Sequence, residues 1–479
     1  MKIYNTLSKE IEQLQPLNPP NLSFYSCGPT VYDYAHIGHL RRYVMDDFLI
    51  RTLKHAGFKV KLVQNVTDVG HLASDADLGE DKMEKGAKKY QLTVWDLAKK
   101  FENHFYSSME KIGNLKPDHI CRATELIDEQ IKMVKELEDK GFTYVIENDG
   151  VYFDTSKLTD YGKLARLDIE NLKAGARVET VEGKRNITDF ALWKFERPGE
   201  DRAMIWPSPW SERGFPGWHI ECSAISVKYL GEQIDLHSGG IDHIPVHHTN
   251  EIAQSETVTG KKPFVKYWIH HNFLQVDGQK MSKSLGNLFT IEDIQERGYH
   301  PLALRLLFLT AHYRSEMNFS WENLAGAQKS YERLISLMMS HQQDRGEVSQ
   351  GEEIGDYRHR FFDLMENDLK TSEAVAVLWE VTKSDLPDTA KVELLLEFDQ
   401  VLGLGLDRAE EANQELGNEG VEETKLPAEV KSILDQRQQA RNTQAWALAD
   451  ELRQQLQSMG YEVTDEAKGQ RVRQLKTSE

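Results

Sequence analysis

The order of apolar and polar residues near the start of the chain predicts a strand, a helix and a second strand. Residues 22–27 form a short apolar run that ends at Gly28. From Leu40 to Leu53, apolar side chains recur every three or four positions until Gly57, which predicts a helix. A second apolar run at residues 60–66 predicts another strand. This order is typical of a β-α-β unit with parallel strands.

The following stretch mixes both kinds of pattern. Residues 70–89 are polar and contain glycine, so a surface loop is expected. Apolar residues at helical spacing predict helices over 95–112 and 126–137. Residues 144–153 contain two apolar triplets around an Asp-Gly pair, which predicts a β-hairpin.

The second half of the chain begins with a strand pattern and then becomes helical. Residues 234–237 predict a strand that ends in a turn at Gly239 and Gly240. The predicted helices span 302–309, 324–339, 361–369, 375–381, 392–402, 428–439 and 445–459.

These patterns predict an α/β protein of several domains, because 479 residues are too many for one core. We expect a Rossmann-like parallel-sheet domain with an inserted α+β subdomain, followed by an α-helical bundle and a small C-terminal domain. The expected divisions are 1–115 and 206–298 for the two halves of the first domain, 116–205 for the insertion, 299–405 for the bundle, 406–426 for an acidic linker and 427–479 for the last domain.

Composition bears on the cellular location of the protein and on its binding partners. The chain has no apolar run that suits a signal peptide or a membrane span, so a cytoplasmic protein is expected. Its three cysteines form no CxxC pair and predict no disulfide framework. The net charge of −19 argues against nonspecific binding of nucleic acid, although a local basic groove is compatible with it. Much of the acid lies at 347–356 and 407–423, two runs expected to be solvated linkers.

Two histidines stand at the start of the first predicted helix. His36 and His39 share a helix face beside unpaired backbone N–H groups, a place that suits phosphate. Gly38 would let a nucleotide lie close to the backbone. An isolated HxxH is more often a pair of surface histidines. Its position between two predicted strands favours a nucleotide site here.

A second candidate for phosphate binding is the loop of residues 280–284, with the sequence KMSKS. Lys280 and Lys283 could close over a triphosphate and neutralise the leaving pyrophosphate. The alternative is a basic surface loop, and the five letters alone do not decide between the two. Their occurrence together with the histidine pair favours nucleotidyl transfer.

Cys27, Cys222, His247 and Glu251 carry the three side-chain types that bind zinc. His247 and Glu251 are four residues apart, on one face if the segment is helical. His248 also reaches Glu251 by a helical step, so spacing does not choose between the two histidines. The alternatives are a closed structural zinc site and two core cysteines without a metal. Structural sites favour closely spaced thiolates, which are absent, so a site that meets the substrate is favoured.

Several further segments accompany these motifs. They are Cys27–Tyr32 (CGPTVY), Asn65–Asp68 (NVTD), Gly217–Cys222 (GWHIEC), His247–Gln254 (HHTNEIAQ), Ala311–Ser315 (AHYRS), and 445–450 and 460–463 in the tail. With them the chain resembles the class I aminoacyl-tRNA synthetases, and most closely the cysteinyl-tRNA synthetase family. The resemblance covers nearly the whole chain. It identifies the last domain with the family's anticodon-binding domain and 299–405 with the region that contacts the tRNA stem.

The resemblance implies how a metal would be used. It assigns Cys27, Cys222, His247 and Glu251 as ligands of one Zn²⁺ ion per chain and thereby favours His247 over His248. Zinc binds a thiolate directly but binds a serine hydroxyl poorly, so L-cysteine could be selected without an editing site. Cys121 fits no motif and is expected to be an ordinary thiol.

The resemblance also implies the reaction. ATP, accompanied by Mg²⁺, would bind at His36, Gly38, His39 and Lys283, with the two histidines acting on the α-phosphate and Lys280 and Lys283 on the other phosphates. L-cysteine would form cysteinyl adenylate and then be transferred to the 3′ end of tRNA(Cys). We expect a monomer with no membrane partner.

The resemblance also implies which residues line the amino-acid pocket. Thr30 and Thr67 are expected beside the amino acid, and Trp218 and His237 as pocket walls, although core packing is an equal alternative for the tryptophan. The chain departs from the family pattern at three places: Val472 where tryptophan is common, Gly70-His71 where acids are common, and Thr249 where glutamate is common.

Two other functions are compatible with parts of the pattern. Related ligases attach cysteine to an amino sugar and need no anticodon reader. A noncatalytic zinc or RNA-binding protein would have no use for both the histidine pair and the lysine loop.

Overall fold

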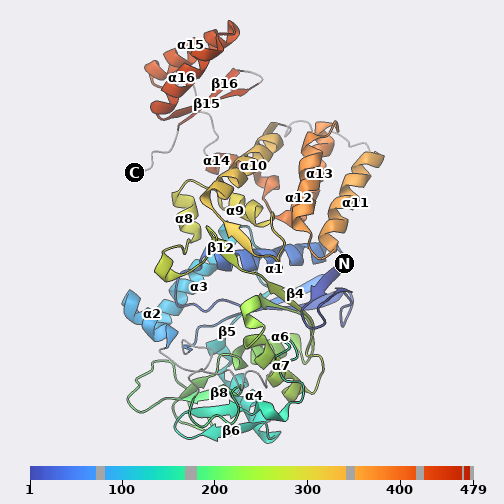
Figure 1. The fold of residues 1–479 in the computed structure, drawn as a ribbon, viewed down its shortest axis with the longest axis vertical. Coiled ribbons are helices and arrows are strands. Elements are labelled where there is room, and N and C mark those ends of the chain that lie inside the picture. Colours follow the sequence, from blue (N-terminus) through green and yellow to red (C-terminus); the bar gives the residue numbers. More distant parts are fainter. Residues whose placement is uncertain (72–80, 168–180, 341–350, 417–425, 467–468, 475–479) are drawn as a thin grey trace.

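The computed structural model describes residues 1–71, 81–167, 181–340, 351–416, 426–466 and 469–474 (Figure 1). Its centre is a five-stranded parallel sheet in the order β11-β10-β3-β4-β5. The strands are β3 (Asn21–Ser26), β4 (Lys59–Val66), β5 (His119–Arg122), β10 (Ile234–Gly240) and β11 (Val265–His271). Segments far apart in sequence therefore build one sheet, and the predicted Rossmann-like parallel fold is confirmed.

Helices cover both faces of this sheet. Successive strand residues point to opposite sides. Phe24 shares a core cluster with the apolar residues of α1 (Ile37–His55), whereas Tyr25 shares another with residues of α6 (Ile220–Leu230) and α7 (His247–Thr259). The strand β4 pairs with one edge of β3, and the later strand β10 pairs with its other edge. The order in which strands are added to the sheet therefore reverses at β3. Ligands of open α/β sheets bind at such a switch point.

The insertion forms a second sheet of four antiparallel strands in the order β6-β7-β8-β9. Its elements are α4 (Ile127–Asp139), β6 (Thr143–Ile146), β7 (Gly150–Phe153), β8 (Phe190–Phe195) and β9 (Gly214–Pro216). The predicted hairpin is confirmed as β6 and β7. Because β9 lies beyond residue 205 and pairs with β8, the sheet extends past the predicted end of the insertion.

Helices dominate the region after the central sheet. They are α8 (Ile291–Glu296), α9 (Pro301–Phe308), α10 (Trp321–Ser340), α11 (Glu352–Glu366), α12 (Thr371–Lys383), α13 (Asp388–Leu402) and α14 (Ala409–Glu415). A small sheet of β12 (Leu274–Val276), β13 (Gln279–Lys280) and β14 (Met317–Phe319) precedes and enters this region. Apolar residues of α9 to α14 share one core cluster with α1, so the bundle is continuous with one face of the central sheet.

The C-terminal unit has a core of its own. It contains α15 (Ala428–Asn442), α16 (Trp446–Ser458) and the hairpin of β15 (Tyr461–Glu466) and β16 (Gly469–Gln474), and it stands apart at the top of Figure 1. The sequence patterns predicted its helices but not the hairpin. Val472 pairs with Val463 across the hairpin, and both side chains are buried in this core. Val472 is therefore a packing residue in this chain.

Three segments predicted as loops or linkers contain helical residues. The predicted loop 70–89 contains α2 (Lys82–Tyr90), which Asp81 caps by accepting hydrogen bonds from the N–H groups of Met83 and Glu84; residues 72–80 lie outside the described part. The predicted linker 406–426 begins with α14, whose small buried residues gave a weak apolar signal, and 417–425 lie outside the described part. The acidic run 347–356 enters α11 at Glu352, with 341–350 outside the described part.

The strand β10 also runs further than predicted, through Gly239 and Gly240. A side chain at Gly239 would collide with the ring of His248, so glycine here allows α7 to approach the strand closely. The remaining elements are β1 (Lys2–Asn5), β2 (Glu10–Gln13) and α3 (Val94–Lys111), with 3₁₀ helices at Ala123–Leu126, Thr155–Lys157, Ile241–His243, Lys283–Leu285 and Leu406–Arg408. In the described part of the chain, no helix has the length and apolar character that crossing a membrane requires.

Candidate metal centre and active site

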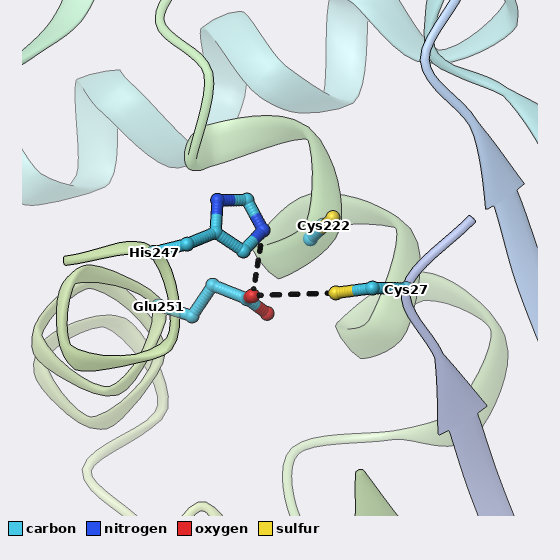
Figure 2. A group of neighbouring side chains, drawn as sticks. All are labelled: Cys27, Cys222, His247 and Glu251. Carbon is cyan, nitrogen blue, oxygen red and sulfur yellow. Dashed lines mark hydrogen bonds and ion pairs between the residues drawn. The ribbon is translucent and has the colours of Figure 1, made fainter. Parts of the chain in front are cut away.

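The four predicted metal ligands converge from three elements (Figure 2). Cys27 directly follows β3, Cys222 lies in the first turn of α6, and His247 and Glu251 lie one turn apart at the start of α7. One ligand atom from each lies within 4.8 Å of all the others, and all four side chains are buried. Two thiols, an imidazole and a carboxylate at this spacing are a donor set that fits zinc.

Short contacts define the geometry of this cluster. His247 Nε2 lies 3.0 Å from Glu251 Oε1, and Cys27 Sγ lies 3.9 Å from the same oxygen. The i, i+4 spacing of His247 and Glu251 therefore does place them on one helix face, as the sequence predicted. The cluster lies at the carboxyl end of β3, where Cys27 N–H donates to Ser238 O of β10 at 3.2 Å.

A second set of side chains is also close enough to hold a metal. Cys27, His237, His248 and Glu251 bring one ligand atom each within the same limit. His248 Nε2 lies 3.3 Å from Cys27 Sγ. The structure thus brings both neighbouring histidines to the cluster, and the first set differs by including a second thiol.

Hydrogen bonds orient ligands of both sets from behind, and in the second set His248 Nδ1 lies 2.7 Å from His270 Nε2. His219 Nδ1 lies 2.9 Å from His247 Nδ1, and His237 Nε2 lies 2.9 Å from Glu251 Oε2. These contacts leave His247 Nε2 and Glu251 Oε1 facing the cysteines. Metal-binding imidazoles and carboxylates are commonly oriented by such outer partners. In the first set, His237 therefore has a defined task behind Glu251.

Charge is balanced within the cluster. Burial raises the pKa of Glu251, but the nearby His237 and His247 outweigh it and hold that pKa well below its usual value. Burial lowers the pKa of His247, yet the Glu251 carboxylate raises it to about 10. Burial raises the pKa of the Cys27 thiol, and the Cys27 thiol and burial together raise that of Cys222. Binding a metal to these thiols would therefore release protons.

The predicted phosphate site lies at the start of α1. His36 is the residue before the helix, and its backbone N–H donates to His39 Nδ1 at 3.5 Å. The two rings are stacked with centres 3.6 Å apart. Partial burial and Lys283 lower the pKa of His36 to about 4, so this imidazole is neutral at neutral pH. His39 is exposed beside it.

The lysine loop lies against this helix end. A Cβ on Gly38 would stand 3.0 Å from Met281 Sδ, so glycine permits the close approach of loop and helix. Ser282 caps the short helix Lys283–Leu285, and its own N–H donates to Asn287 Oδ1 at 2.8 Å. Lys280 and Lys283 are exposed. The structure thus brings together the two motifs predicted to act on one nucleotide.

The four predicted amino-acid contacts differ in their relation to the candidate metal ligands. Thr30 and Thr67 form a parallel bridge between neighbouring segments. The ring centre of Trp218 lies 4.6 Å from that of His247, so this tryptophan borders the cluster. His237, in contrast, is fully buried and stacks on Trp268 at 4.5 Å, with its polar contact to Glu251.

Sequence reasoning missed several buried partners. Glu221 accepts hydrogen bonds from Thr67 Oγ1 at 3.2 Å and pairs with His71 Nε2 at 2.7 Å. His71 is one of the departures from the family pattern, and the contact explains how a histidine is accommodated there. The partners His219 and Glu221 stand inside the quoted GWHIEC segment, which was the only available signal for them.

Family models match most of the chain. The description "tRNA synthetases class I (C) catalytic domain" fits residues 13–329, and "Cysteinyl-tRNA ligase anticodon binding domain" fits residues 423–473. A protein of Burkholderia lata named cysteine–tRNA ligase 1 is 45% identical over 473 residues, which are 98% of this chain and 96% of the relative. A cysteine–tRNA ligase of Treponema denticola is 40% identical over 488 residues, 98% of each chain.

Solved structures support the same fold. A methionyl-tRNA synthetase of Mycobacterium tuberculosis in complex with methionyl-adenylate aligns over 90% of this chain and 96% of its own, with a TM-score of 0.53 at 16% identity. A ternary complex of Agrobacterium radiobacter LeuRS, tRNA and LeuAMS aligns over 85% and 86%, with a TM-score of 0.59 at 12% identity. The parallel-sheet core, the two family models and the relatives agree: this chain belongs to the cysteine–tRNA ligase family of class I tRNA synthetases.

Proposed function

We propose that the chain activates L-cysteine with ATP and transfers it to the 3′ end of tRNA(Cys). The observation that carries this proposal is the meeting of two thiols, an imidazole and a carboxylate within 4.8 Å, at the sheet end from which α1 and its histidines start. Arg42 and Tyr43 of α1 donate to the Cys27 carbonyl, so the helix that begins at the phosphate site is tied to the cluster.

The metal is proposed to be one Zn²⁺ ion held by Cys27, Cys222, His247 and Glu251. When bound, the ion would supply a soft Lewis acid that accepts a thiolate in preference to a hydroxyl. His219 and His237 would keep the imidazole and the carboxylate turned toward it. Thr30, Thr67 and Trp218 are proposed to line the rest of the amino-acid pocket, with His237 contributing through Glu251.

The nucleotide is proposed to lie on the start of α1, with Mg²⁺ bound to its phosphates. The cysteine carboxylate attacks the α-phosphorus, and pyrophosphate leaves. His36 and His39 would donate hydrogen bonds to the α-phosphate oxygens as negative charge builds on them, with Gly38 leaving room for the nucleotide. Lys280 and Lys283 would neutralise the departing phosphates. The side chains then position and stabilise without acting as nucleophiles.

Transfer of cysteine requires the protein to bind tRNA, and we propose that two regions of the chain contact it. The C-terminal unit is proposed to read the anticodon, and the bundle at 299–405 to contact the stem. Trp446 at the start of α16 is 56% exposed, which suits stacking on a base. Buried Val472 cannot serve in that way, so the ring common in relatives has no counterpart at that position. The protein is proposed to act as a cytoplasmic monomer.

The experiment combines metal analysis with two activity assays. Purified protein should contain about one zinc per chain, as in related metal sites. Cysteine-dependent exchange of pyrophosphate into ATP should exceed the serine-dependent rate by at least about 10⁴-fold, because serine cannot supply the thiolate. Equal rates with serine, or active protein without zinc, would contradict the proposal.

An assay of tRNA charging shows whether tRNA or an amino sugar accepts the cysteine. The match of residues 423–473 to an anticodon-binding family model favours tRNA over an amino sugar. Transfer of cysteine to an amino sugar instead of tRNA would identify the ligase alternative, and absence of exchange would leave a noncatalytic protein.

A further inference from the structure

Asp33 links the phosphate site to α2 and to the lysine loop. It lies three residues before His36, in the loop between β3 and α1. Its carboxylate accepts hydrogen bonds from Lys283 and from Tyr90 OH, and Lys89 Nζ lies 3.3 Å from Oδ2. The proposed chemistry gives Asp33 no role, although three side chains from two other segments converge on it.

The contact holds the lysine loop at the nucleotide site. Lys283 Nζ also lies 5.4 Å from the centre of the Tyr32 ring, a distance typical of cation–π contacts. The side chain is nevertheless 62% exposed, so a ligand can reach the ammonium group. The loop is therefore held in place while its charge stays accessible.

Asp33 carries a full negative charge in this arrangement. Burial raises its pKa, but hydrogen bonds from Lys283, Tyr90 and the Tyr34 N–H outweigh it and lower the pKa to about 2. An ion pair exposed to this degree is screened and weak. A triphosphate, with several charges and a metal ion, would compete successfully for Lys283.

The end of α2 keeps Asp33 in position. Lys89 and Tyr90 are the last residues of α2, so the helix supplies two of the three donors to the carboxylate. Apolar residues of α2 share a core cluster with α3 and with Val31, two residues before Asp33. The two α2 residues that contact Asp33 therefore belong to a helix that is packed into the core.

We propose that Asp33 is a positioning residue for ATP, which holds Lys283 over the start of α1 before the nucleotide arrives and releases it to the phosphates. This inference rests on the proposed function of the lysine loop. A loop that is already held near its working place loses less conformational freedom when ATP binds, so ATP binds more tightly.

The test is Asp33→Asn, which removes the charge and keeps the shape. ATP affinity, measured without cysteine or tRNA, should fall by about fivefold, because the freed loop loses more conformational freedom when ATP binds. Trypsin should cleave faster after Lys280 and Lys283. The maximal rate of cysteine-dependent exchange should stay within about twofold, because Lys283 still reaches bound phosphates. Glu380→Gln, which removes the exposed pair with Arg360, is the matched control and should change none of these.

A double variant shows whether Asp33 acts through Lys283. In a Lys283→Ala background, Asp33→Asn should have no further effect on ATP affinity. Unchanged or tighter ATP binding in Asp33→Asn, or an effect that persists without Lys283, would overturn the inference. Tyr90→Phe, which removes one donor, replaces Asp33→Asn if that variant does not fold and should weaken ATP binding in the same direction. Because ATP binding and cleavage need no cysteine, these results are independent of the exchange assay that tests the proposed function.

Discussion

Partial burial and the nearby Lys283 decide the charge of His36 at the start of α1. Because they lower its pKa to about 4, this imidazole takes up no proton at neutral pH. In the unfolded chain it would titrate near 6.5. As pH falls below that value, the unfolded state binds a proton that the folded state does not, so His36 makes the protein less stable in acid.

Replacing His39 by Ala should lower the rate of adenylate formation by about 10² to 10³, the usual cost of losing a donor to a developing charge. The free energy of unfolding should fall less between pH 7 and pH 5 in His36→Ala, because that variant lacks an imidazole with a lowered pKa. Exchange kinetics and urea unfolding measure the two effects, with the exposed His359→Ala as control. An unchanged exchange rate in His39→Ala would contradict its assignment.

The cysteines allow a matched comparison of thiols. Cys222 lies in the metal cluster, whereas Cys121 is equally buried on β5, outside both potential metal sets of the described residues. Cys222→Ser should lower zinc affinity by more than about 100-fold, since even outer partners cost ten- to hundredfold. Cys121→Ser should keep zinc and activity. Chelator competition followed by metal analysis measures the difference, and equal zinc retention in the two variants would argue against Cys222 as a ligand.

At the scale of elements, the sequence predicted helices and strands with regular apolar spacing. It did not predict contacts between segments that are far apart in the chain. The helix at α1 and the strands β3 and β4 followed from regular apolar spacing. Helical spacing linked Glu251 to both His247 and His248, and only the family resemblance favoured His247. The helix α2 was missed because its few buried residues include a glycine and an alanine. The contacts of His219 with His247 and of His237 with Glu251 join separate segments, so only the packing of α6 and β10 against α7 reveals them.

The close contact of α1 with the lysine loop depends on glycine at position 38. In Gly38→Ala, the new Cβ would lie 3.0 Å from Met281 Sδ and 3.1 Å from the His36 ring. The Met281 side chain and the His36 ring would have to shift by a few tenths of an ångström, and kcat/KM for ATP should fall by about tenfold through misplacement. Gly326→Ala in α10 is the control, because its Cβ would meet nothing within 4 Å. Equal kcat/KM values for both variants would show that the loop does not need this close approach.

At the scale of the whole molecule, the C-terminal unit has a hydrophobic core separate from that of the central sheet and bundle. The central sheet shares a core cluster with the bundle, while α15, α16 and their hairpin enclose another. With a net charge of −19, nonspecific attraction to tRNA is weak, so we expect tRNA recognition to depend on local contacts. Activation of cysteine and reading of the anticodon should therefore be separable.

A chain ending at residue 416 tests this separation. Because the C-terminal core is independent, the shortened protein should fold and keep cysteine-dependent pyrophosphate exchange within about threefold. Its kcat/KM for tRNA(Cys) should fall by about 100-fold or more, since each lost base contact costs one to three kcal/mol. Trp446→Ala in the full chain should reproduce part of that loss without affecting exchange. If the shortened protein loses exchange and charging equally while remaining folded, the C-terminal unit supports the active site directly, and the two tasks are not separable.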